Sequence, residues 1–469
     1  MGKMVSSPRR KRAVAESVPE ITTFSSAVRY LYDRVDFERM RVVRYDETMF
    51  KLDRMRQLLN GLGNPHEQIR TVHVAGTLGK GSTAAMIGSM LQGAGYGVGV
   101  FCSPHLIDVR ERITINTHRI GKSDFTRLMR EAAGVAAKMS TEPTFFELCT
   151  AAAFKHFADQ VVDIAVIEVG LGGRLDSTNL IIPLVSVITR IDYDHTHILG
   201  RTLPEIAREK AGIFKRGVPA LTIEQPREVE EVLRDAAREL DVELRILNKD
   251  IEFSCRFGAS DALGPHSRVC VLTETSQFMH LPVPLPGEHQ AINCGLALAV
   301  IDVLKRSGFE FPEVPMNEGL AATRTPGRME LVWNQPRILI DGAHNPAAVG
   351  ALMRSVGAYV PYDSLICIFG CCADKDIPSM LSQLASGGDK VIFTRAKWTP
   401  RAADPGELHR QFTERTGKMS QVAPSLPKAL DLATRAVGRD DLICIAGSFY
   451  LAGEAKKYLA QLARKRQQR

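Results

Sequence analysis

The chain has 469 residues, 45% hydrophobic and 24% charged, which is typical of a soluble globular protein with more than one domain. Much of its formal net charge of +7 lies in two polybasic ends, "GKMVSSPRRKR" and "ARKRQQR", so the body is close to neutral and a nucleic-acid partner is not expected. The nine cysteines have no regular framework, and their odd number argues against a secreted disulfide scaffold.

The two ends of the chain carry no recognisable fold. Residues 1–20 are predicted to be a disordered basic tail, because they combine like charges with few large apolar side chains. The longest uncharged run, between Lys80 and His105, is broken by Gly93, Gly95, Gly97 and Gly99 and is better explained by helix, turn and strand than by a membrane span. We therefore expect a cytoplasmic monomer with small-molecule partners and no membrane contact.

The first large segment alternates short apolar runs with helical ones. "TVHVAG", "YGVGVFCS", "VDIAVIEVG" and "LVSVITRI" are apolar and rich in β-branched residues, and helical segments such as "STAAMIGSMLQGAG" lie between them. Continuous apolar strands between helices predict an α/β fold with a mostly parallel sheet covered on both faces. Residues 251–285 differ, since their short turn-bounded segments predict a small antiparallel patch.

A second α/β unit is predicted towards the C-terminus. A helix, "HQAINCGLALAVIDVLKRSG", is followed by a Pro-rich stretch, and four further candidate strands begin with "RILIDG". We place the boundary near residue 322, giving domains 21–322 and 323–469. Cys367, Cys371 and Cys372 fall in and after one of these strands, and buried thiols explain them better than a metal site because no second pair at zinc spacing accompanies them.

"HVAGTLGKGSTAAM", residues 73–86, predicts a phosphate-binding loop. A strand runs through a glycine-bearing turn into a helix, where backbone N–H groups and the helix N-terminus together attract anions. Lys80 supplies a mobile cation and Ser82 a hydroxyl for Mg²⁺. The spacing G-x-x-G-K-G-S is tighter than the usual G-x-x-x-x-G-K-[ST], and a plain glycine turn remains the alternative.

Several polar residues follow other predicted strands or begin helices. Glu147 begins a helix, where it is either a metal ligand or an ordinary acid favoured by the helix dipole. His195 follows a strand and is either a ligand or a capping or core residue. Lys210 lies on an amphipathic helix, where most lysines are simply solvated.

Two further loops carry the same ambiguity. In "IEVGLGGRLDSTN", Asp176, Thr178 and Asn179 either orient substrate or metal-bound water, or close a turn. In the second domain, Arg328 is suited to clamp a transferring phosphoryl group. Just past a strand, "LIDGAHNP" offers the polar residues Asp341, His344 and Asn345. A surface arginine and a polar turn are the alternative interpretation.

Taken in order, these motifs resemble those of the folylpolyglutamate synthase/dihydrofolate synthase family of the Mur-ligase superfamily, over roughly residues 45–455. The resemblance rests on "TVHVAGTLGKGS", "SPHLIDVRERI", "TFFELCTAAAF", "EVGLGGRLDSTN", "DHTHILGRTLPEIAREKAGIFK", "GEHQAINCGLALA", "PGRMELV", "IDGAHNP" and "AGSFYLAGE". It implies a P-loop-type ATP-binding domain followed by a Rossmann-like C-terminal α/β domain. It also implies an ATP-dependent amide ligase that adds L-glutamate to dihydropteroate, folates or both through an acyl phosphate.

The resemblance also implies roles for individual residues. ATP and its phosphates would be held by Gly76, Thr77, Gly79, Lys80, Gly81, Ser82, Thr83, Gln290, Asn293, Arg328 and Asp341. The Mg²⁺ ligands would be Ser82, Glu147, His195 and, as a carbamylated lysine, Lys210. The residues of the reaction itself would be Lys80, Lys210, Arg328 and His344. The pterin and glutamate substrates would contact Ser103, Pro104, His105, Asp176, Thr178, Asn179, His344, Ser448 and Tyr450.

One position departs from the family pattern. The family usually has Gly-Thr-Asn-Gly-Lys-Gly-Ser in the phosphate loop, and Leu78 replaces the asparagine here. Any polar contact from that side chain is lost, so weaker activity or a shifted substrate is the expected risk. Two alternatives therefore stay open: a Mur-type ligase acting on another carboxylate, and a nucleotide-binding protein with reduced turnover.

Overall fold

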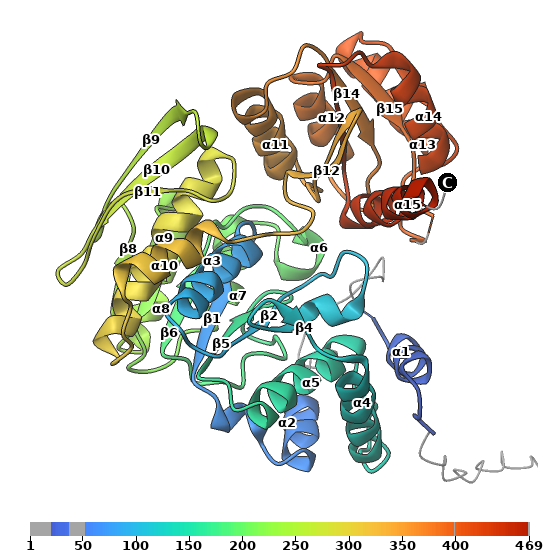
Figure 1. The fold of residues 1–469 in the computed structure, drawn as a ribbon. Helices are drawn as coiled ribbons and strands as arrows, with labels where there is room; N and C mark the ends of the chain where they lie inside the picture. Colours follow the sequence, from blue (N-terminus) through green and yellow to red (C-terminus); the bar gives the residue numbers. More distant parts are fainter. Residues whose placement is uncertain (1–19, 37–51, 398, 468–469) are drawn as a thin grey trace, which may run out of the picture.

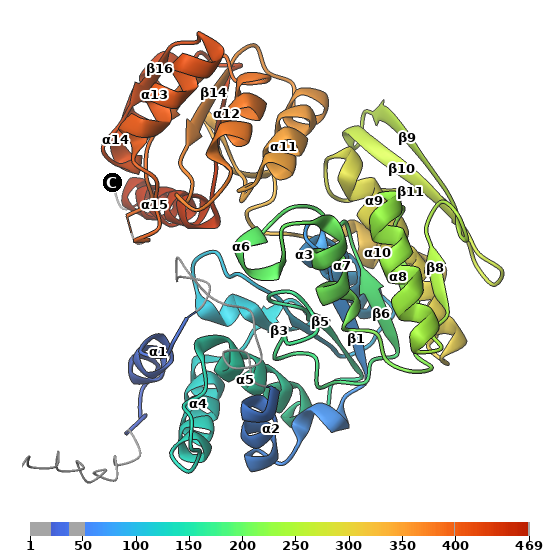
Figure 2. The ribbon, with the colours of Figure 1, turned by 180° about the vertical axis from the view of Figure 1, so that it is seen from behind.

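The computed structural model describes residues 20–36, 52–397 and 399–467 (Figure 1). Apart from Glu20, the basic tail expected over residues 1–20 lies outside these ranges. The chain forms two α/β bodies, each built on its own sheet, and a narrow antiparallel sheet projects from the first (Figures 1 and 2). The α/β class expected from the sequence is confirmed, including the small antiparallel patch.

The first sheet has eight strands in the order β4-β3-β2-β5-β1-β6-β7-β8. Its strands are β1 (Thr71–Ala75), β2 (Val98–Phe101), β3 (Ile113–Ile115), β4 (His118–Arg119), β5 (Ile164–Glu168), β6 (Val185–Ile188), β7 (Ala220–Thr222) and β8 (Leu244–Ile246). From β2 to β8 all neighbouring strands are parallel, and β3 and β4 add an antiparallel edge.

Helices cover both faces of this sheet. They are α1 (Phe24–Tyr32), α2 (Leu52–Gly61), α3 (Lys80–Gly93), α4 (Lys122–Ala136), α5 (Phe145–Asp159), α6 (Thr196–Leu199), α7 (Leu203–Ala211), α8 (Arg227–Glu239), α9 (Glu288–Arg306) and α10 (Glu313–Ala321), with short 3-10 helices at Pro65–Gln68 and Val109–Arg112. Strand β5 shows the two layers: Ile164 and Val166 pack with α3 and α9, whereas Ala165 and Ile167 pack with α4 and α5. This double burial explains why the strand is apolar throughout.

The antiparallel sheet consists of β9 (Glu252–Ser260), β10 (Gly264–Leu272) and β11 (Gln277–Pro282), in the order β11-β10-β9. Val269, Val271 and Phe278 join the core cluster that contains α9, so this sheet is anchored along one side of that helix. Residues 322–329 then lead from α10 into the second body.

The C-terminal sheet has six strands in the order β12-β13-β17-β14-β15-β16, parallel except for β12 against β13. The strands are β12 (Glu330–Asn334), β13 (Arg337–Ile340), β14 (Leu365–Phe369), β15 (Lys390–Phe393), β16 (Ser420–Val422) and β17 (Leu442–Ala446). The helices are α11 (Pro346–Tyr359), α12 (Ile377–Ala385), α13 (Pro405–Thr416), α14 (Leu426–Ala436) and α15 (Phe449–Gln467). Along β14, Leu365 and Cys367 face one core cluster, and Ile366 and Ile368 face the other.

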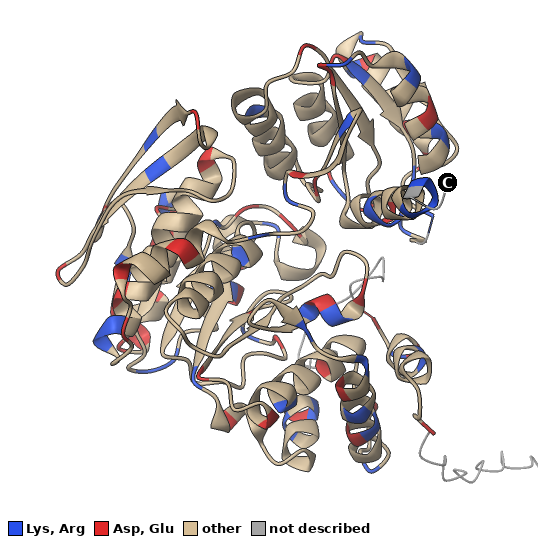
Figure 3. Cartoon of the chain, in the orientation of Figure 1, with Lys and Arg blue, Asp and Glu red and all other residues tan. Residues whose placement is uncertain are grey.

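The cysteines in the C-terminal domain include the three that the sequence analysis singled out. Cys367, Cys371 and Cys372 are all buried, and burial raises the pKa of each thiol. Acidic and basic side chains are interspersed over both bodies, with basic ones gathered at the end of α15 (Figure 3). Within the described ranges, every helix is too short or too polar to span a bilayer.

Candidate active site

A cavity lies where the carboxyl ends of β1, β5 and β6 face the C-terminal domain. It collects predicted residues from distant parts of the chain: Gly76, Thr77, Gly79, Lys80, Gly81, Ser103, Pro104, His105, Glu147, Asp176, His195, Lys210, Arg328, His344, Ser448 and Tyr450. A second cavity of about 1060 Å³ adjoins it and shares Leu78, Gly79 and Arg328. The second cavity also contains Ser82, Gln290, Asn293 and Asp341.

The phosphate loop requires glycine at two positions. Gly76 has a φ of +144°, and a Cβ there would lie 1.9 Å from the hydroxyl of Thr189. Gly79 has a φ of +89° and precedes α3, and a Cβ there would lie 2.4 Å from the amide oxygen of Asn293. Larger side chains would strain the backbone at both positions, and at Gly79, which lines both cavities, they would also collide with Asn293.

The loop's own N–H groups divide into two sets. Those of Thr77 and Leu78 donate to the carbonyl of Arg190, at 2.8 and 3.1 Å, which ties the loop to the end of β6. Those of Lys80, Gly81 and the next residues open α3, where the first N–H groups of a helix have no acceptor inside it. An anion bound here would therefore meet the start of α3 rather than the turn before it.

The carboxylate that faces Lys80 is Glu168, the last residue of β5. Its Oε1 lies 4.0 Å from Lys80 Nζ, and its Oε2 accepts the N–H of Ser103 at 3.1 Å. Burial raises the pKa of Glu168, while Lys80 and the Ser103 N–H oppose that rise. Glu168 was not among the ligands predicted from the sequence. Its position was visible there, however, because the apolar run "DIAVIE" ends in this acid.

Glu147 occupies a different setting from the one expected. Both of its oxygens accept from Arg54 Nε, at 2.9 and 2.7 Å, and Oε2 also accepts the N–H of Thr144 at the start of α5. Arg54 and Glu147 are both buried. Although Glu147 lines the first cavity, its carboxylate is already engaged by a cation and a helix cap, so we prefer Glu168, beside Lys80, as the candidate metal ligand.

His195 lies beside a charged bridge between the two domains. Lys375 from the C-terminal domain reaches Asp194 Oδ1 at 2.5 Å, and His344 Nε2 lies 3.6 Å from Asp194 Oδ2. Burial disfavours the ionised form of Asp194, but His195, His344 and Lys375 hold its pKa well below the usual value. Burial lowers the pKa of His195 to about 4, so the ring is neutral at pH 7 although 35% of it reaches solvent. Asp194 and Lys375 were missed by the sequence interpretation.

Lys210 is buried rather than solvated. Its Nζ donates to the carbonyl of Gly76 at 2.8 Å, so this hydrogen bond holds the start of the phosphate loop in place. Burial, helped by the nearby charge of Lys80, lowers the pKa of Lys210 to about 7. A substantial fraction of this amine is therefore uncharged at neutral pH.

Asp176, Thr178 and Asn179 mainly close their own loop. Asp176 accepts from the N–H and hydroxyl of Thr178, and the Thr178 hydroxyl also pairs with His73 at 2.9 Å. The amide of Asn179 donates to the carbonyls of Arg174 and Gly212. The expected substrate contacts therefore do not fit Thr178 and Asn179, which are buried and lie outside both cavity linings, whereas Asp176 lines the first cavity.

The segment Ser103, Pro104 and His105 forms one wall of the first cavity, with a cis peptide bond between Ser103 and Pro104. Arg112 Nε donates to His105 Nδ1 at 2.8 Å, and His105 Nε2 lies 3.0 Å from the hydroxyl of Tyr32. Because Nδ1 acts as an acceptor, the ring proton of neutral His105 is on Nε2 and is donated to Tyr32. This wall is thus fixed by hydrogen bonds before any ligand binds.

The second cavity begins beside the phosphate loop. Asn293 and Gln290, on α9, are both buried, and the Asn293 amide donates to Gln290 Oε1 at 3.1 Å. Ser82 lines this cavity next to Gly79. The side chain of Thr83 is fully buried and lies outside both linings, so any contact of this residue with the nucleotide would come from its backbone.

Arg328 is the C-terminal domain's cation between the two cavities. Its guanidinium lies over the ring of Phe449, 4.6 Å from the centroid. Asp341, on the same side, accepts the N–H groups of Met329 and Ala343 at 2.8 and 2.7 Å, so its carboxylate shapes the loop that carries Arg328. Burial raises the pKa of Asp341, and Arg328 opposes that rise.

Ser448 and Tyr450 lie at the start of α15. Ser448 Oγ donates to the carbonyl of Gly370 at 3.1 Å and accepts the N–H of Leu451 at 3.2 Å, so this buried hydroxyl is already used within the domain. Tyr450 is partly buried and lines the first cavity. Of the two, Tyr450 is the better candidate for a substrate contact.

Comparisons with known proteins agree with this arrangement. The Mur ligase middle domain matches residues 74–301, and the Mur ligase, glutamate ligase domain matches residues 327–449. The dihydrofolate synthase/folylpolyglutamate synthase of Bacillus subtilis is 35% identical over 414 residues, which cover 87% of this chain and 94% of the relative. The folylpolyglutamate synthase of Lacticaseibacillus casei is 34% identical over 413 residues, 87% of this chain and 94% of that protein.

Solved structures agree at the level of the whole chain. Mycobacterium tuberculosis folylpolyglutamate synthase complexed with ADP superimposes with a TM-score of 0.84 at 32% identity, over 93% of this chain and 98% of that one. Escherichia coli FolC in complex with DHPP and ADP gives 0.81 at 29% identity, over 95% and 100%. The fold and the two matched domains thus define an ATP-dependent ligase of the Mur type. Within that class, the chain belongs to the dihydrofolate synthase/folylpolyglutamate synthase family.

Proposed function

We propose that the protein is an ATP-dependent acid–amino-acid ligase that adds L-glutamate to dihydropteroate, to folates, or to both. The observation that carries this proposal is the composition of the first cavity. Lys80, Glu168 and His195 line it from the N-terminal domain, and Arg328 and Lys375 from the C-terminal domain. One cavity thus brings a phosphate loop next to cations suited to an acidic amino acid.

ATP would span the two cavities. The second cavity, with Gln290 and Asn293 on its wall, is the larger and accepts the nucleoside, and Gly79 joins it to the first cavity. The triphosphate would then meet the N-terminus of α3 and Lys80. Relatives solved with ADP support this orientation in general terms, because their folds match this chain throughout.

The residues present fit Mg²⁺. Glu168 offers a buried carboxylate beside Lys80, and His195 is neutral at pH 7 and can coordinate through a ring nitrogen. Ser82 would supply a hydroxyl from the phosphate loop. Lys210, as the carbamate of its amine, would supply oxygens for a second ion. When bound, these ions would neutralise charge on the phosphates.

The proposed reaction has two steps. The substrate carboxylate attacks the γ-phosphorus of ATP, which forms an acyl phosphate and releases ADP, and Lys80 and Arg328 stabilise the charge that develops on the transferred group. The amine of glutamate then attacks the acyl carbon, and inorganic phosphate leaves. The amine must lose a proton for this attack, and His344, which lies on the cavity wall, is positioned to accept it.

The acceptor would enter past the apolar side of the first cavity. Phe146 lines that side and packs against Phe101 with ring centroids 5.7 Å apart, and the His105 wall faces the same space. A flat heteroaromatic ring system, such as a pterin, suits an aromatic and hydrogen-bonding wall. We also propose that the protein acts as a monomer in the cytoplasm, since the cavity is complete within one chain and its nine cysteines are unpaired.

The test is incubation with ATP, Mg²⁺ and labelled glutamate, with dihydropteroate and tetrahydrofolate offered separately. The proposal predicts a labelled amide from at least one of them, with ADP and phosphate formed in equal amount. Product from some other carboxylate alone would reject the folate assignment and favour another Mur-type acceptor. ATP binding without ADP release under any condition would favour a nucleotide-binding protein with reduced turnover.

A further inference from the structure

The loop of residues 102–112 has two sides. One side lines the first cavity, and the other packs against the C-terminal domain. On the cavity side lie the Ser103 N–H, which donates to Glu168, and the ring of His105. On the other side, Leu106 packs against the C-terminal core cluster formed by β13, β14 and β17 with α14 and α15. Among the described residues, Leu106 is the one apolar side chain from the N-terminal domain that packs against that cluster.

Leu106 approaches the C-terminal domain at two glycines. A Cβ at Gly453, in α15, would lie 2.1 Å from the carbonyl oxygen of Leu106. A Cβ at Gly327 would lie 3.1 Å from Leu106 Cδ1, at a residue whose φ is +71°. The first distance is shorter than any van der Waals contact allows, so this docking position exists because residue 453 has no side chain.

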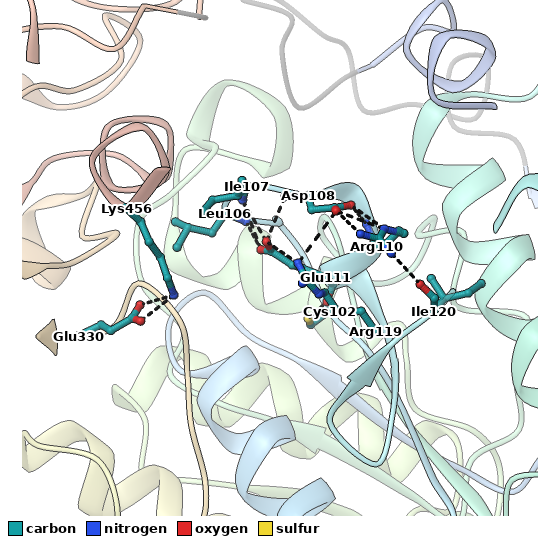
Figure 4. A network of polar contacts seen from close by, with 10 residues as sticks. All are labelled: Cys102, Leu106, Ile107, Asp108, Arg110, Glu111, Arg119, Ile120, Glu330 and Lys456. Atoms are coloured by element: carbon teal, nitrogen blue, oxygen red, sulfur yellow. Dashed lines mark hydrogen bonds and ion pairs between the residues drawn. The ribbon is translucent and has the colours of Figure 1, made fainter. Parts of the chain in front are cut away.

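The loop that presents Leu106 is held rigid from behind by Glu111 (Figure 4). The Glu111 carboxylate accepts the N–H groups of Leu106, Ile107 and Asp108 at 2.8, 3.3 and 3.0 Å, and Arg119 lies 3.8 Å from it. The Glu111 carboxylate, which lies near Arg119, therefore holds the backbone of three consecutive residues in place. Leu106 is presented in a set position rather than on a loose loop.

The C-terminal segments against which Leu106 packs are also held by hydrogen bonds and an ion pair, and one of them carries Arg328. Lys456, one turn after Gly453 in α15, pairs with both oxygens of Glu330 at 2.6 and 2.9 Å (Figure 4). Glu330 Oε2 also accepts the N–H of Gly327 at 2.8 Å. Arg328 is the next residue, so the turn against which Leu106 packs is the turn that aims this guanidinium at the cavity.

We propose that Leu106 is a positioning residue that locks the two domains in the closed arrangement needed for ligation. The inference rests on the proposed function. With Leu106 seated between Gly327 and Gly453, the wall that carries His105 and the turn that carries Arg328 are held together around the cavity. If this packing of Leu106 is lost, water enters the cavity and attacks the acyl phosphate, which yields the free carboxylate and inorganic phosphate instead of the amide.

The experiment compares phosphate released with amide formed, at saturating substrates, in the full chain. For Leu106→Ala we expect several-fold more phosphate per amide than for the wild type, together with a lower kcat for amide formation. Ile107→Ala is the matched control, because this neighbour is held by the same Glu111 but exposes 41% of its surface. It should keep the wild-type ratio near one.

Gly453→Ala tests the same docking position at a different atom, since its methyl group would push away the backbone carbonyl of Leu106, which Leu106→Ala leaves in place. It should also raise the ratio. A wild-type ratio in Leu106→Ala and Gly453→Ala would overturn the inference, and if Leu106→Ala fails to fold, Gly453→Ala alone decides. A wild-type protein that forms no amide would instead refute the proposed function, and the inference with it.

Discussion

Lys375 and Asp194 form a largely shielded ion pair across the domain boundary, with 2.5 Å between Nζ and Oδ1, and both side chains line the first cavity. The pair holds the domains together, and it also places a C-terminal cation where an acidic amino acid would arrive. Asp194 is the residue before His195, so the same pair connects the proposed glutamate side of the cavity with the proposed metal side.

Lys375→Met should therefore weaken glutamate use. Because hydrogen bonds to charged groups contribute about 1.5–3 kcal/mol, we expect the KM for glutamate to rise at least about tenfold, with a smaller change in the KM for ATP. Steady-state kinetics with each substrate varied in turn measures this. Lys390→Met, at an exposed lysine of the same domain, is the control. Equal effects on both KM values would contradict a role at the glutamate side.

Glu168→Gln and Glu147→Gln should separate chemistry from stability. Loss of the Glu168 charge beside Lys80 should lower kcat by about 10²–10³-fold and raise the Mg²⁺ concentration needed for activity. Glu147→Gln should instead lower the free energy of unfolding by about 3 kcal/mol, because it leaves Arg54 buried without its charged partner. Denaturant unfolding and Mg²⁺ titration of activity measure the two effects. If Glu147→Gln instead raised the Mg²⁺ requirement and Glu168→Gln only lowered stability, Glu147 would be the metal ligand.

Lys210 should make activity depend on carbon dioxide and pH. Its pKa of about 7 means that the amine is mostly protonated at pH 6 and mostly neutral at pH 8, and only the neutral amine can form a carbamate. Added bicarbonate should therefore stimulate CO₂-depleted enzyme more strongly at pH 8 than at pH 6. Lys210→Met should be inactive and insensitive to bicarbonate. An enzyme that is fully active in CO₂-free buffer at pH 8 would argue against the carbamate.

Leu78→Asn tests the departure in the phosphate loop. The N–H groups of Thr77 and Leu78 are already satisfied by Arg190, so the loop keeps its shape without a polar side chain at residue 78. A regained side-chain hydrogen bond contributes about 1 kcal/mol, so the KM for ATP should fall by less than about tenfold. A rise in kcat of several orders of magnitude would instead show that Leu78 makes the wild-type protein nearly inactive.

The sequence was informative where neighbours in the chain decide the structure. Apolar runs such as "DIAVIEVG" predict buried parallel strands, and the glycines around Lys80 predict the phosphate loop, because both depend on residues within one strand–turn–helix unit. The motif matches then placed Arg328 and His344 near the same site, and both do line the first cavity.

The sequence was misleading where partners are distant. Glu147 was placed at a helix start, as either a metal ligand or an ordinary helix acid, and nothing near it in the chain shows that Arg54, 93 residues earlier, pairs with its carboxylate. Lys375 was overlooked for the same reason, since its partner Asp194 is 181 residues away. Pairings of this kind depend on how the sheets and domains pack.

The most direct test of the account follows an oxygen atom. If the acceptor carboxylate is labelled with ¹⁸O, formation of an acyl phosphate requires that one labelled oxygen leaves with the phosphate when glutamate attacks. We therefore predict one ¹⁸O atom in each inorganic phosphate released during amide formation, measured by mass spectrometry. Amide formation with unlabelled phosphate would show that the carboxylate never attacks phosphorus and would contradict the proposed mechanism.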